Sequence, residues 1–229
     1  MQIIAILLAG GVGSRFGADR PKQFLEVKGR TILEHAIEAF ERNSYIDEIV
    51  VVAHPAHAAD VEALFIANSS WSKPHRILLG GKERYDSSLA AIRAFADIED
   101  AALLIHDSVR PLVSQRIISD VCRALKAGAS AVNLAVPCVD TIIEVEDGRM
   151  VAAPQRSRFM RVQTPQAFRL SIIAEAYRRA MADSAFSATD DCGVVFRYMP
   201  EVPIHIVEGE ERNAKLTHPS DLPLFEQML

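Results

Sequence analysis

Cysteine is scarce in this 229-residue sequence, which contains three widely spaced residues, Cys122, Cys138 and Cys192. They form neither a CxxC pair nor a Cys/His spacing typical of zinc sites, so we predict ordinary reduced thiols in a cytoplasmic protein. Long apolar runs are also absent, because no stretch approaches the roughly 18–20 residues that a membrane-spanning helix requires, and we expect no membrane partner. The apolar stretch 1–9 lacks a basic region and a cleavage site, which predicts a buried first strand rather than a signal peptide.

An excess of positive charge is absent as well. The sequence has 25 Lys and Arg against 30 Asp and Glu, a net charge of -5. Non-specific phosphate binding needs a broad basic face, so we expect no nucleic-acid partner, although a local cluster of cations could bind a small phosphate ligand. Hydrophobic residues make up 49% of the chain. This composition predicts a single compact domain over 1–229, without long disordered stretches.

Short apolar runs alternate with helical periodicity through most of the chain. Continuous Val, Ile and Leu runs separated by amphipathic stretches predict an α/β fold with a doubly wound, mostly parallel, Rossmann-like sheet. The expected strands are 3–8, 49–53, 77–79, 101–105, 131–136 and 204–207, and the expected helices are 32–42, 58–67, 87–95, 115–127, 171–181 and 219–228.

Residues 137–158 depart from this pattern. Alternating residues at 141–146 and 149–153 flank Asp147-Gly148, a dipeptide typical of a β-hairpin turn. A two-stranded ribbon is barely stable alone. We therefore expect a projecting arm that packs on a second subunit, which predicts a homodimer.

The strongest chemical signal is a glycine-rich loop after the first expected strand, Leu7-Leu8-Ala9-Gly10-Gly11-Val12-Gly13-Ser14-Arg15-Phe16-Gly17, followed by Pro21-Lys22-Gln23-Phe24-Leu25. Glycines here let the backbone point N–H groups at a phosphate chain, although a tight strand-to-helix turn would use the same residues. The Gly-Lys-Ser/Thr of a P-loop is absent. A dinucleotide fingerprint is also incomplete, because the strand 49–53 ends without an acidic residue. Arg15 and Lys22 suit a triphosphate, unless they are simply exposed cations.

These motifs and several that follow in order resemble one family. Gly10-Gly11-x-Gly-x-Arg15 with Pro21-Lys22-Gln23-Phe24 looks like the nucleotidyltransferase fold of sugar-nucleotide pyrophosphorylases. More narrowly, it is similar to the CTP-dependent polyol-phosphate cytidylyltransferases, which act on 2-C-methyl-D-erythritol 4-phosphate or ribitol 5-phosphate. The resemblance covers almost the whole chain and continues through Gly80-Gly81-Lys82-Glu83-Arg84-x-x-Ser87, His106-Asp107-Ser108-Val109-Arg110-Pro111, Asp140-Thr141, Gln163-Thr164-Pro165-Gln166-x-Phe168, Thr189-Asp190-Asp191 and Asn213-Ala214-Lys215-Leu216-Thr217.

The resemblance implies transfer of CMP from CTP to a polyol phosphate, with release of pyrophosphate and with Mg²⁺ as the cofactor. Mg²⁺ would be held weakly by Asp107 and mainly by phosphate oxygens. The catalytic cations would be Arg15, Lys22 and Lys215, around the triphosphate. The nucleotide would contact Ala9, Gly10, Gly11, Gly81, Lys82, Ser87 and Asp107.

The acceptor would be bound by Arg156, Thr164 and Lys215 of one subunit, and by Arg110 and Thr141 offered from the partner subunit. Arg156 could instead be a solvated residue of a basic stretch.

Two motifs leave a role open. His106 is either a packed core histidine or a catalytic group, and we favour the core. Asp190-Asp191 resemble a metal-ligand pair, but we favour a helix N-cap before 192–197. Asp107 could likewise cap the helix that is expected near 114–127.

The motif residues favour D-ribitol 5-phosphate as the acceptor, because the turn around Val109 and the segment that contains Val195 resemble the ribitol branch. The doublet after Thr189 resembles the methylerythritol branch, so 2-C-methyl-D-erythritol 4-phosphate, an intermediate of isoprenoid biosynthesis, is the alternative. Two other classes compete. An NAD-dependent oxidoreductase would need an acid after 49–53, and a non-catalytic nucleotide sensor would be expected to lack the three cations.

Overall fold

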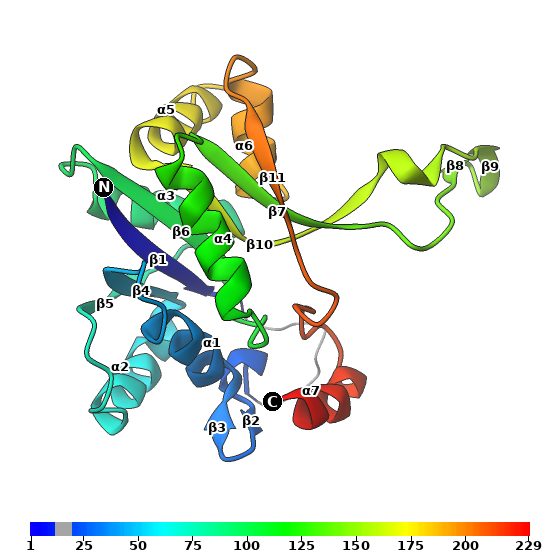
Figure 1. Ribbon diagram of the computed structural model, residues 1–229. Helices are drawn as coiled ribbons and strands as arrows, with labels where there is room; N and C mark the ends of the chain where they lie inside the picture. Colours follow the sequence, from blue (N-terminus) through cyan, green and yellow to red (C-terminus); the bar gives the residue numbers. More distant parts are fainter. Residues whose placement is uncertain (12–19) are drawn as a thin grey trace.

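A seven-stranded sheet forms the centre of the protein. The computed structural model describes residues 1–11 and 20–229. The strand order is β11-β7-β10-β6-β1-β4-β5 (Figure 1). Strand β10 runs antiparallel to both neighbours, and the other neighbouring pairs of the described sheet run parallel. The predicted mostly parallel α/β sheet is therefore confirmed. The strands are β1 (Gln2–Ala9), β4 (Glu48–Ala53), β5 (His75–Leu79), β6 (Ala101–Asp107), β7 (Ala131–Pro137), β10 (Met160–Arg169) and β11 (Ile204–Glu208).

Helices cover both faces of this sheet. Successive side chains of a strand point to opposite faces, and in β1 Ile3, Ala5 and Leu7 join one core while Ile4 and Ile6 join the other. The first core also contains side chains of α1 (Ile32–Glu41), α2 (Ala58–Ala67) and α4 (Gln115–Lys126). The second contains side chains of α3 (Arg84–Ala94), α5 (Leu170–Ala180) and α6 (Asp191–Tyr198).

Three strands were not predicted from the sequence. A small antiparallel ribbon joins β2 (Glu26–Val27) to β3 (Arg30–Thr31). Strand β10 was missed because its Gln-Thr-Pro-Gln segment lacks strand alternation and contains a proline, which normally disfavours an internal strand. The pairing of β10 with β7 shifts register between Gln163 and Ala167, which accommodates that proline.

A third, smaller core fixes the C-terminal segment. The expected helix 219–228 begins as a 3₁₀ turn, Pro219–Asp221, and continues as α7 (Leu222–Met228). Phe225 of α7 packs with Leu216, and both contact apolar residues of the loop after β6. This packing brings the last part of the chain beside the carboxyl end of the sheet.

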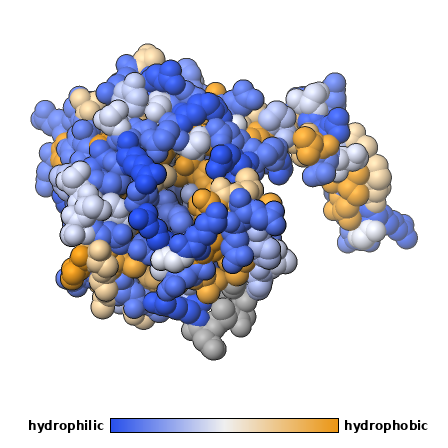
Figure 2. All heavy atoms as spheres, turned by 60° about the horizontal axis from the view of Figure 1, so that its bottom comes forward, coloured by the Kyte–Doolittle hydropathy of each residue, from blue (hydrophilic) through white to orange (hydrophobic). Residues whose placement is uncertain are grey.

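A hairpin extends away from the sheet between β7 and β10 (Figure 1). Its strands are β8 (Glu144–Glu146) and β9 (Arg149–Ala152). Asp147 and Gly148 have φ values of 48° and 74°, as the predicted Asp-Gly hairpin turn requires. Figure 2 shows apolar side chains gathered along this arm, which stands off from a largely hydrophilic body. Among the described residues, no helix has the length and apolar character to cross a membrane.

Candidate active site

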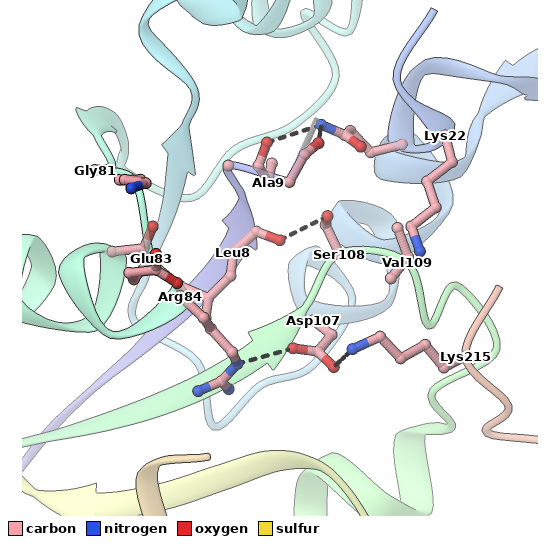
Figure 3. A pocket seen from close by; sticks show the side chains of 15 residues that line it. Leu8, Ala9, Lys22, Gly81, Glu83, Arg84, Asp107, Ser108, Val109 and Lys215 are labelled. Atoms are coloured by element: carbon pink, nitrogen blue, oxygen red, sulfur yellow. Dashed lines mark hydrogen bonds and ion pairs between the residues drawn. The ribbon is translucent and has the colours of Figure 1, made fainter. Parts of the chain in front are cut away.

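A pocket of about 330 Å³ lies at the carboxyl ends of β1 and β6 and the start of α3. Open α/β sheets bind ligands at this edge. The pocket is lined by most of the predicted nucleotide and catalytic residues (Figure 3): Ala9, Gly10, Gly11, Lys22, Gly81, Lys82, Ser87, Asp107 and Lys215. Arg15 lies outside the described residues.

Two glycine loops close over the start of α3. A Cβ on Gly80 would lie 2.5 Å from Ser87 Oγ, and a Cβ on Gly81 would lie 2.5 Å from Asp86 Cβ. Real Cβ atoms do not approach this closely, so a side chain at Gly80 would push the Ser87 hydroxyl aside and one at Gly81 would displace the helix start. The close approach explains why the sequence has a glycine pair here, and it brings Ser87 against Gly10 of the first loop.

Gln23 holds the start of the first glycine loop. Its amide nitrogen donates hydrogen bonds to the carbonyl oxygens of Ala9 (2.9 Å) and Gly11 (3.0 Å). The side chain is buried. No role was predicted for Gln23 from the sequence, and the only signal was its place in the motif Pro21-Lys22-Gln23-Phe24 directly after the glycine loop.

Asp107 is the electrostatic centre of the pocket. Lys215 Nζ lies 2.9 Å from Oδ2, Arg84 Nε lies 3.4 Å from Oδ1, and Arg110 Nε lies 3.7 Å from Oδ2. Burial alone would raise the pKa of Asp107. The positive charges of Lys215 and, after it, Arg84 have the opposite effect and together outweigh burial, so the net pKa falls well below the usual range of a carboxyl group. Asp107 is therefore an anion surrounded by cations at neutral pH.

Lys22 reaches the pocket from the segment that follows the glycine loop. Its Nζ donates a hydrogen bond to the carbonyl oxygen of Leu216, 2.9 Å away. Leu216 follows Lys215 directly, so the two predicted catalytic lysines line the same pocket although they are far apart in sequence. Figure 3 shows the Lys215 ammonium group directed at Asp107 and the Lys22 ammonium group near Val109.

A second cavity of about 420 Å³ adjoins the first and shares Arg84, Asp107 and Lys215 with it. The predicted acceptor residues Arg110 and Thr164 line it. The rest of its wall consists of Asp190, the predicted helix cap, and of four side chains without a predicted role: Val162, Gln163, Gln166 and Thr189.

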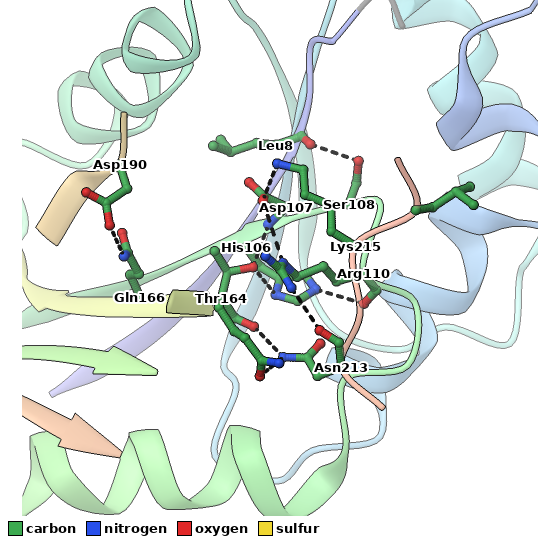
Figure 4. A network of polar contacts seen from close by, with 12 residues as sticks. Leu8, His106, Asp107, Ser108, Arg110, Thr164, Gln166, Asp190, Asn213 and Lys215 are labelled. Carbon is green, nitrogen blue, oxygen red and sulfur yellow. Dashed lines mark hydrogen bonds and ion pairs between the residues drawn. The ribbon is translucent and has the colours of Figure 1, made fainter. Parts of the chain in front are cut away.

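His106 is a buried structural residue, as predicted. Its Nε2 lies 3.1 Å from the carbonyl oxygen of Arg110 and must donate, so Nδ1 of the neutral ring accepts from the Thr164 hydroxyl at 3.0 Å (Figure 4). The same hydroxyl oxygen accepts the backbone N–H of Asp107. Burial lowers the pKa of His106 to about 4, although Asp107 partly opposes this shift.

Asn213 ties the C-terminal segment to this network. Its side-chain amide donates to the carbonyl oxygen of Thr164 at 2.9 Å and to Gln163 Oε1 at 3.2 Å, and its own carbonyl oxygen accepts from Arg110 Nη1 at 2.8 Å. These bonds lie two residues before Lys215 and fix the backbone that carries it.

Within one chain, the structure places the predicted acceptor residues Arg110, Thr164, Thr141 and Arg156 at two separate positions. Arg110 was expected from the partner subunit, but it follows β6 directly and lies beside Asp107 of its own chain. Arg156 was expected in the pocket of its own chain, but it lies on the arm, like Thr141, and its Nη1 donates to the carbonyl oxygen of Val139. The structure therefore brings Arg110 and Thr164 together and leaves Thr141 and Arg156 apart from them.

The Asp190-Asp191 doublet has two roles in the structure. Asp190 is the N-cap of α6, as predicted, because its Oδ1 accepts from the backbone N–H of Gly193 at 2.9 Å. Asp191 is buried and forms a 2.7 Å ion pair with Arg84. That ion pair was not predicted from the sequence.

Comparison with known proteins agrees with this arrangement. The family model described as 2-C-methyl-D-erythritol 4-phosphate cytidylyltransferase matches residues 3–229. The chain is 48% identical over 234 residues to a protein of that name from Thermobifida fusca, covering 100% of this chain and 93% of the other. It is 41% identical over 228 residues to a bifunctional ribulose 5-phosphate reductase/CDP-ribitol pyrophosphorylase of Haemophilus influenzae, covering 98% of this chain and 48% of that protein. The crystal structure of the 4-diphosphocytidyl-2C-methyl-D-erythritol synthase of Anaerococcus prevotii superimposes with a TM-score of 0.86 at 27% identity, covering 99% of this chain and 95% of that one.

Proposed function

Since this chain belongs to the 2-C-methyl-D-erythritol 4-phosphate cytidylyltransferase family and is a CTP-dependent cytidylyltransferase, we propose that its acceptor is 2-C-methyl-D-erythritol 4-phosphate. The sequence motifs favour ribitol 5-phosphate, whereas the matching family model and the 48% identical relative favour the methylerythritol acceptor. We give the full-length matches more weight, because they compare the whole chain rather than a few turn residues.

The composition of the second cavity supports this choice. Val162 is an apolar side chain among polar and charged lining residues, and 45% of it is exposed. The methylerythritol acceptor carries a methyl branch that such a side chain would contact, whereas ribitol 5-phosphate is unbranched. Ribitol 5-phosphate stays the second candidate, because the Haemophilus influenzae relative is named as a CDP-ribitol pyrophosphorylase and the turn motifs favour the ribitol acceptor.

The first pocket is proposed to bind CTP. Backbone groups of Ala9, Gly10 and Gly11 would contact the nucleotide, and Gly81, Lys82 and Ser87 would face its base and ribose. Their shared lining of one cavity supports this assignment. Arg110 and Thr164 would bind the acceptor in the second cavity, next to Asp107 and Lys215.

The reaction needs alignment and charge compensation more than a general base. A phosphate monoester has its second pKa near about 6, so the acceptor phosphate is already a nucleophile at neutral pH. One of its oxygens bonds to the α-phosphorus of CTP while the bond to the β-phosphate oxygen breaks, and pyrophosphate leaves with the electron pair. Lys22 and Lys215 would reduce the repulsion between the two anions and hold them in line, together with Arg15 of the glycine loop.

Mg²⁺ is the proposed cofactor, and the pocket fits it. Within the residues that the structure describes, no three His, Cys, Asp or Glu side chains come together as a metal site. Asp107 supplies one ionised carboxylate, which suits an ion that takes most of its ligands from phosphate oxygens and water. When bound, Mg²⁺ would neutralise charge on the triphosphate. Asp107 would hold it at the boundary of the two cavities.

A homodimer with a shared acceptor site is the proposed assembly. The arm exposes Val145, Met150 and Val151, which are 54%, 59% and 51% exposed. A two-stranded ribbon gains stability when such side chains pack on another surface. On a second subunit the arm would present Thr141 and Arg156 to the acceptor cavity there.

Pyrophosphate release tests the acceptor. The protein is incubated with CTP and Mg²⁺, and with either polyol phosphate in turn. We expect turnover with 2-C-methyl-D-erythritol 4-phosphate and a much lower kcat/KM with ribitol 5-phosphate. The reverse order would establish the second candidate, and no pyrophosphate with either acceptor would reject both.

A further inference from the structure

Asp191 is a buried carboxylate to which the proposed reaction gives no role. Its side chain is inaccessible to solvent. Oδ2 accepts from Arg84 Nη1 at 2.7 Å, and Oδ1 accepts from the Tyr177 hydroxyl at 2.7 Å. Its backbone N–H donates to Gln166 Oε1 at 3.0 Å. Both carboxylate oxygens and the backbone are therefore fixed.

Arg84 connects this carboxylate to the pocket. Its Nη1 is bonded to Asp191, while its Nε lies 3.4 Å from Asp107 Oδ1. Arg84 lines both cavities, and Figure 3 shows it reaching Asp107 from the side opposite Lys215. Burial would lower the pKa of Arg84. The negative charges of Asp191 and, after it, Asp107 outweigh burial and raise the pKa, so the guanidinium stays charged.

The two oxygens of Asp107 are held from opposite sides. Arg84 contacts Oδ1, and Lys215 contacts Oδ2. In the proposed function Lys215 turns to the reacting phosphates, and Oδ2 then loses its nearest partner. The contact from Arg84 persists, because Arg84 is anchored in the protein interior rather than by the substrate.

We propose that Asp191 is a positioning residue, which orients Arg84 so that Arg84 holds Asp107 in the geometry that receives Mg²⁺ with CTP. This inference rests on the proposed function for CTP as the ligand and for Mg²⁺ at Asp107. A purely structural role is a poor explanation for the pair, because a buried ion pair contributes little net stability compared with apolar side chains of similar volume. The doublet that the sequence left open thus consists of a helix cap, Asp190, and a support for the site, Asp191.

The test is the affinity for CTP, measured by titration calorimetry with Mg²⁺ and with EDTA. We expect Asp191→Asn to weaken CTP binding in Mg²⁺ by about 10- to 100-fold, the usual loss when a group that orients a metal ligand is removed, and to leave binding in EDTA nearly unchanged. A merely structural residue would weaken both equally, and that outcome would overturn the proposal. The measurement needs no acceptor, so failure of the proposed acceptor in the pyrophosphate assay is a separate result.

A double-mutant cycle with Asp107 identifies the route. In the Asp107→Asn background, Asp191→Asn should add less than about twofold to the loss in Mg²⁺, because the group that it positions is already gone. Equal losses in both backgrounds would contradict a connection through Asp107. In an Arg84→Met background, Asp191→Asn should likewise add less than about twofold to the loss of CTP affinity in Mg²⁺.

Two further variants control for folding. Asp183 is half-buried and is held by Arg197 at 3.1 Å and by the Tyr198 hydroxyl at 2.6 Å, the same pair of partner types as at Asp191. Asp183→Asn should leave CTP affinity unchanged in both conditions. If Asp191→Asn does not fold, Tyr177→Phe removes one hydrogen bond to the same carboxylate and should weaken Mg²⁺-dependent binding by about two- to tenfold. A Tyr177→Phe protein with unchanged affinity would also overturn the proposal.

Discussion

Lys22 Nζ lies 2.9 Å from the carbonyl oxygen of Leu216, although 194 positions separate the two residues in the chain. This bond joins the segment after the glycine loop to the segment that carries Lys215. The lysines from the two ends of the polypeptide therefore meet at one pocket, where charge on a triphosphate would need to be compensated.

Removal of either lysine should abolish most turnover while the fold persists. The Lys215 side chain is 43% exposed and Lys22 lines the pocket, so neither side chain fills the core. We expect Lys22→Ala and Lys215→Ala each to lower kcat by about 10²- to 10³-fold, as when one electrostatic donor to a transition state is lost. Lys126 of α4, whose ammonium group lies over the Tyr45 ring, provides the control. Lys126→Ala should retain activity. Loss of the circular dichroism spectrum in either pocket variant would contradict this expectation.

Alanine substitutions in the two glycine loops should separate an effect on stability from an effect on CTP binding. Gly81→Ala places a Cβ 2.5 Å from Asp86 Cβ, whereas a Cβ on Gly11 meets nothing within 4 Å. We expect Gly81→Ala to lower the free energy of unfolding by about 1–3 kcal/mol, the usual effect of overpacking. Gly11→Ala should leave stability unchanged and weaken only CTP binding. Denaturant titration and calorimetry measure the two effects, and equal stabilities would show that the helix start adapts.

Protonation of His106 should destabilise the protein in mild acid. The pKa of the buried ring is about 4, compared with 6.5 for an ordinary histidine. Between these values the unfolded chain binds a proton that the folded chain does not, so stability falls as pH decreases from about 6.5 toward about 4. This residue can contribute a slope of up to about 1.4 kcal/mol per pH unit. In His106→Asn that contribution should disappear, and identical slopes in the two proteins would contradict the assignment.

Removal of the hairpin should yield a monomer. We expect replacement of residues 141–153 by a short Gly-Ser linker to give a single subunit in light scattering, because the exposed apolar side chains of the arm are lost. CTP binding should persist, since the first pocket contains no arm residue. The KM for the acceptor should rise with the loss of Thr141. A dimer that survives the deletion would rule out the proposed assembly.

The local pattern of the sequence determined most secondary structure and many of the residues around the pocket. The expected helix 58–67 coincides with α2, and the Asp147-Gly148 turn forms as predicted. Such features depend on residues close together in the chain, whose backbone preferences and side-chain spacing are visible in the sequence. The glycine loop likewise follows β1 directly, so its place at the sheet edge required no knowledge of distant contacts.

Tertiary structure alone decided which distant residues meet. The ion pair of Arg84 with Asp191 spans 107 positions, and that of Lys215 with Asp107 spans 108. The antiparallel insertion of β10 between β6 and β7 likewise follows from sheet packing rather than from the strand's own residues. These contacts form because the sheet order and two hydrophobic cores bring strand ends to one edge, and burial there makes charged side chains pair. The charged residues can be identified from the sequence, but the packing of the sheet determines which of them form pairs.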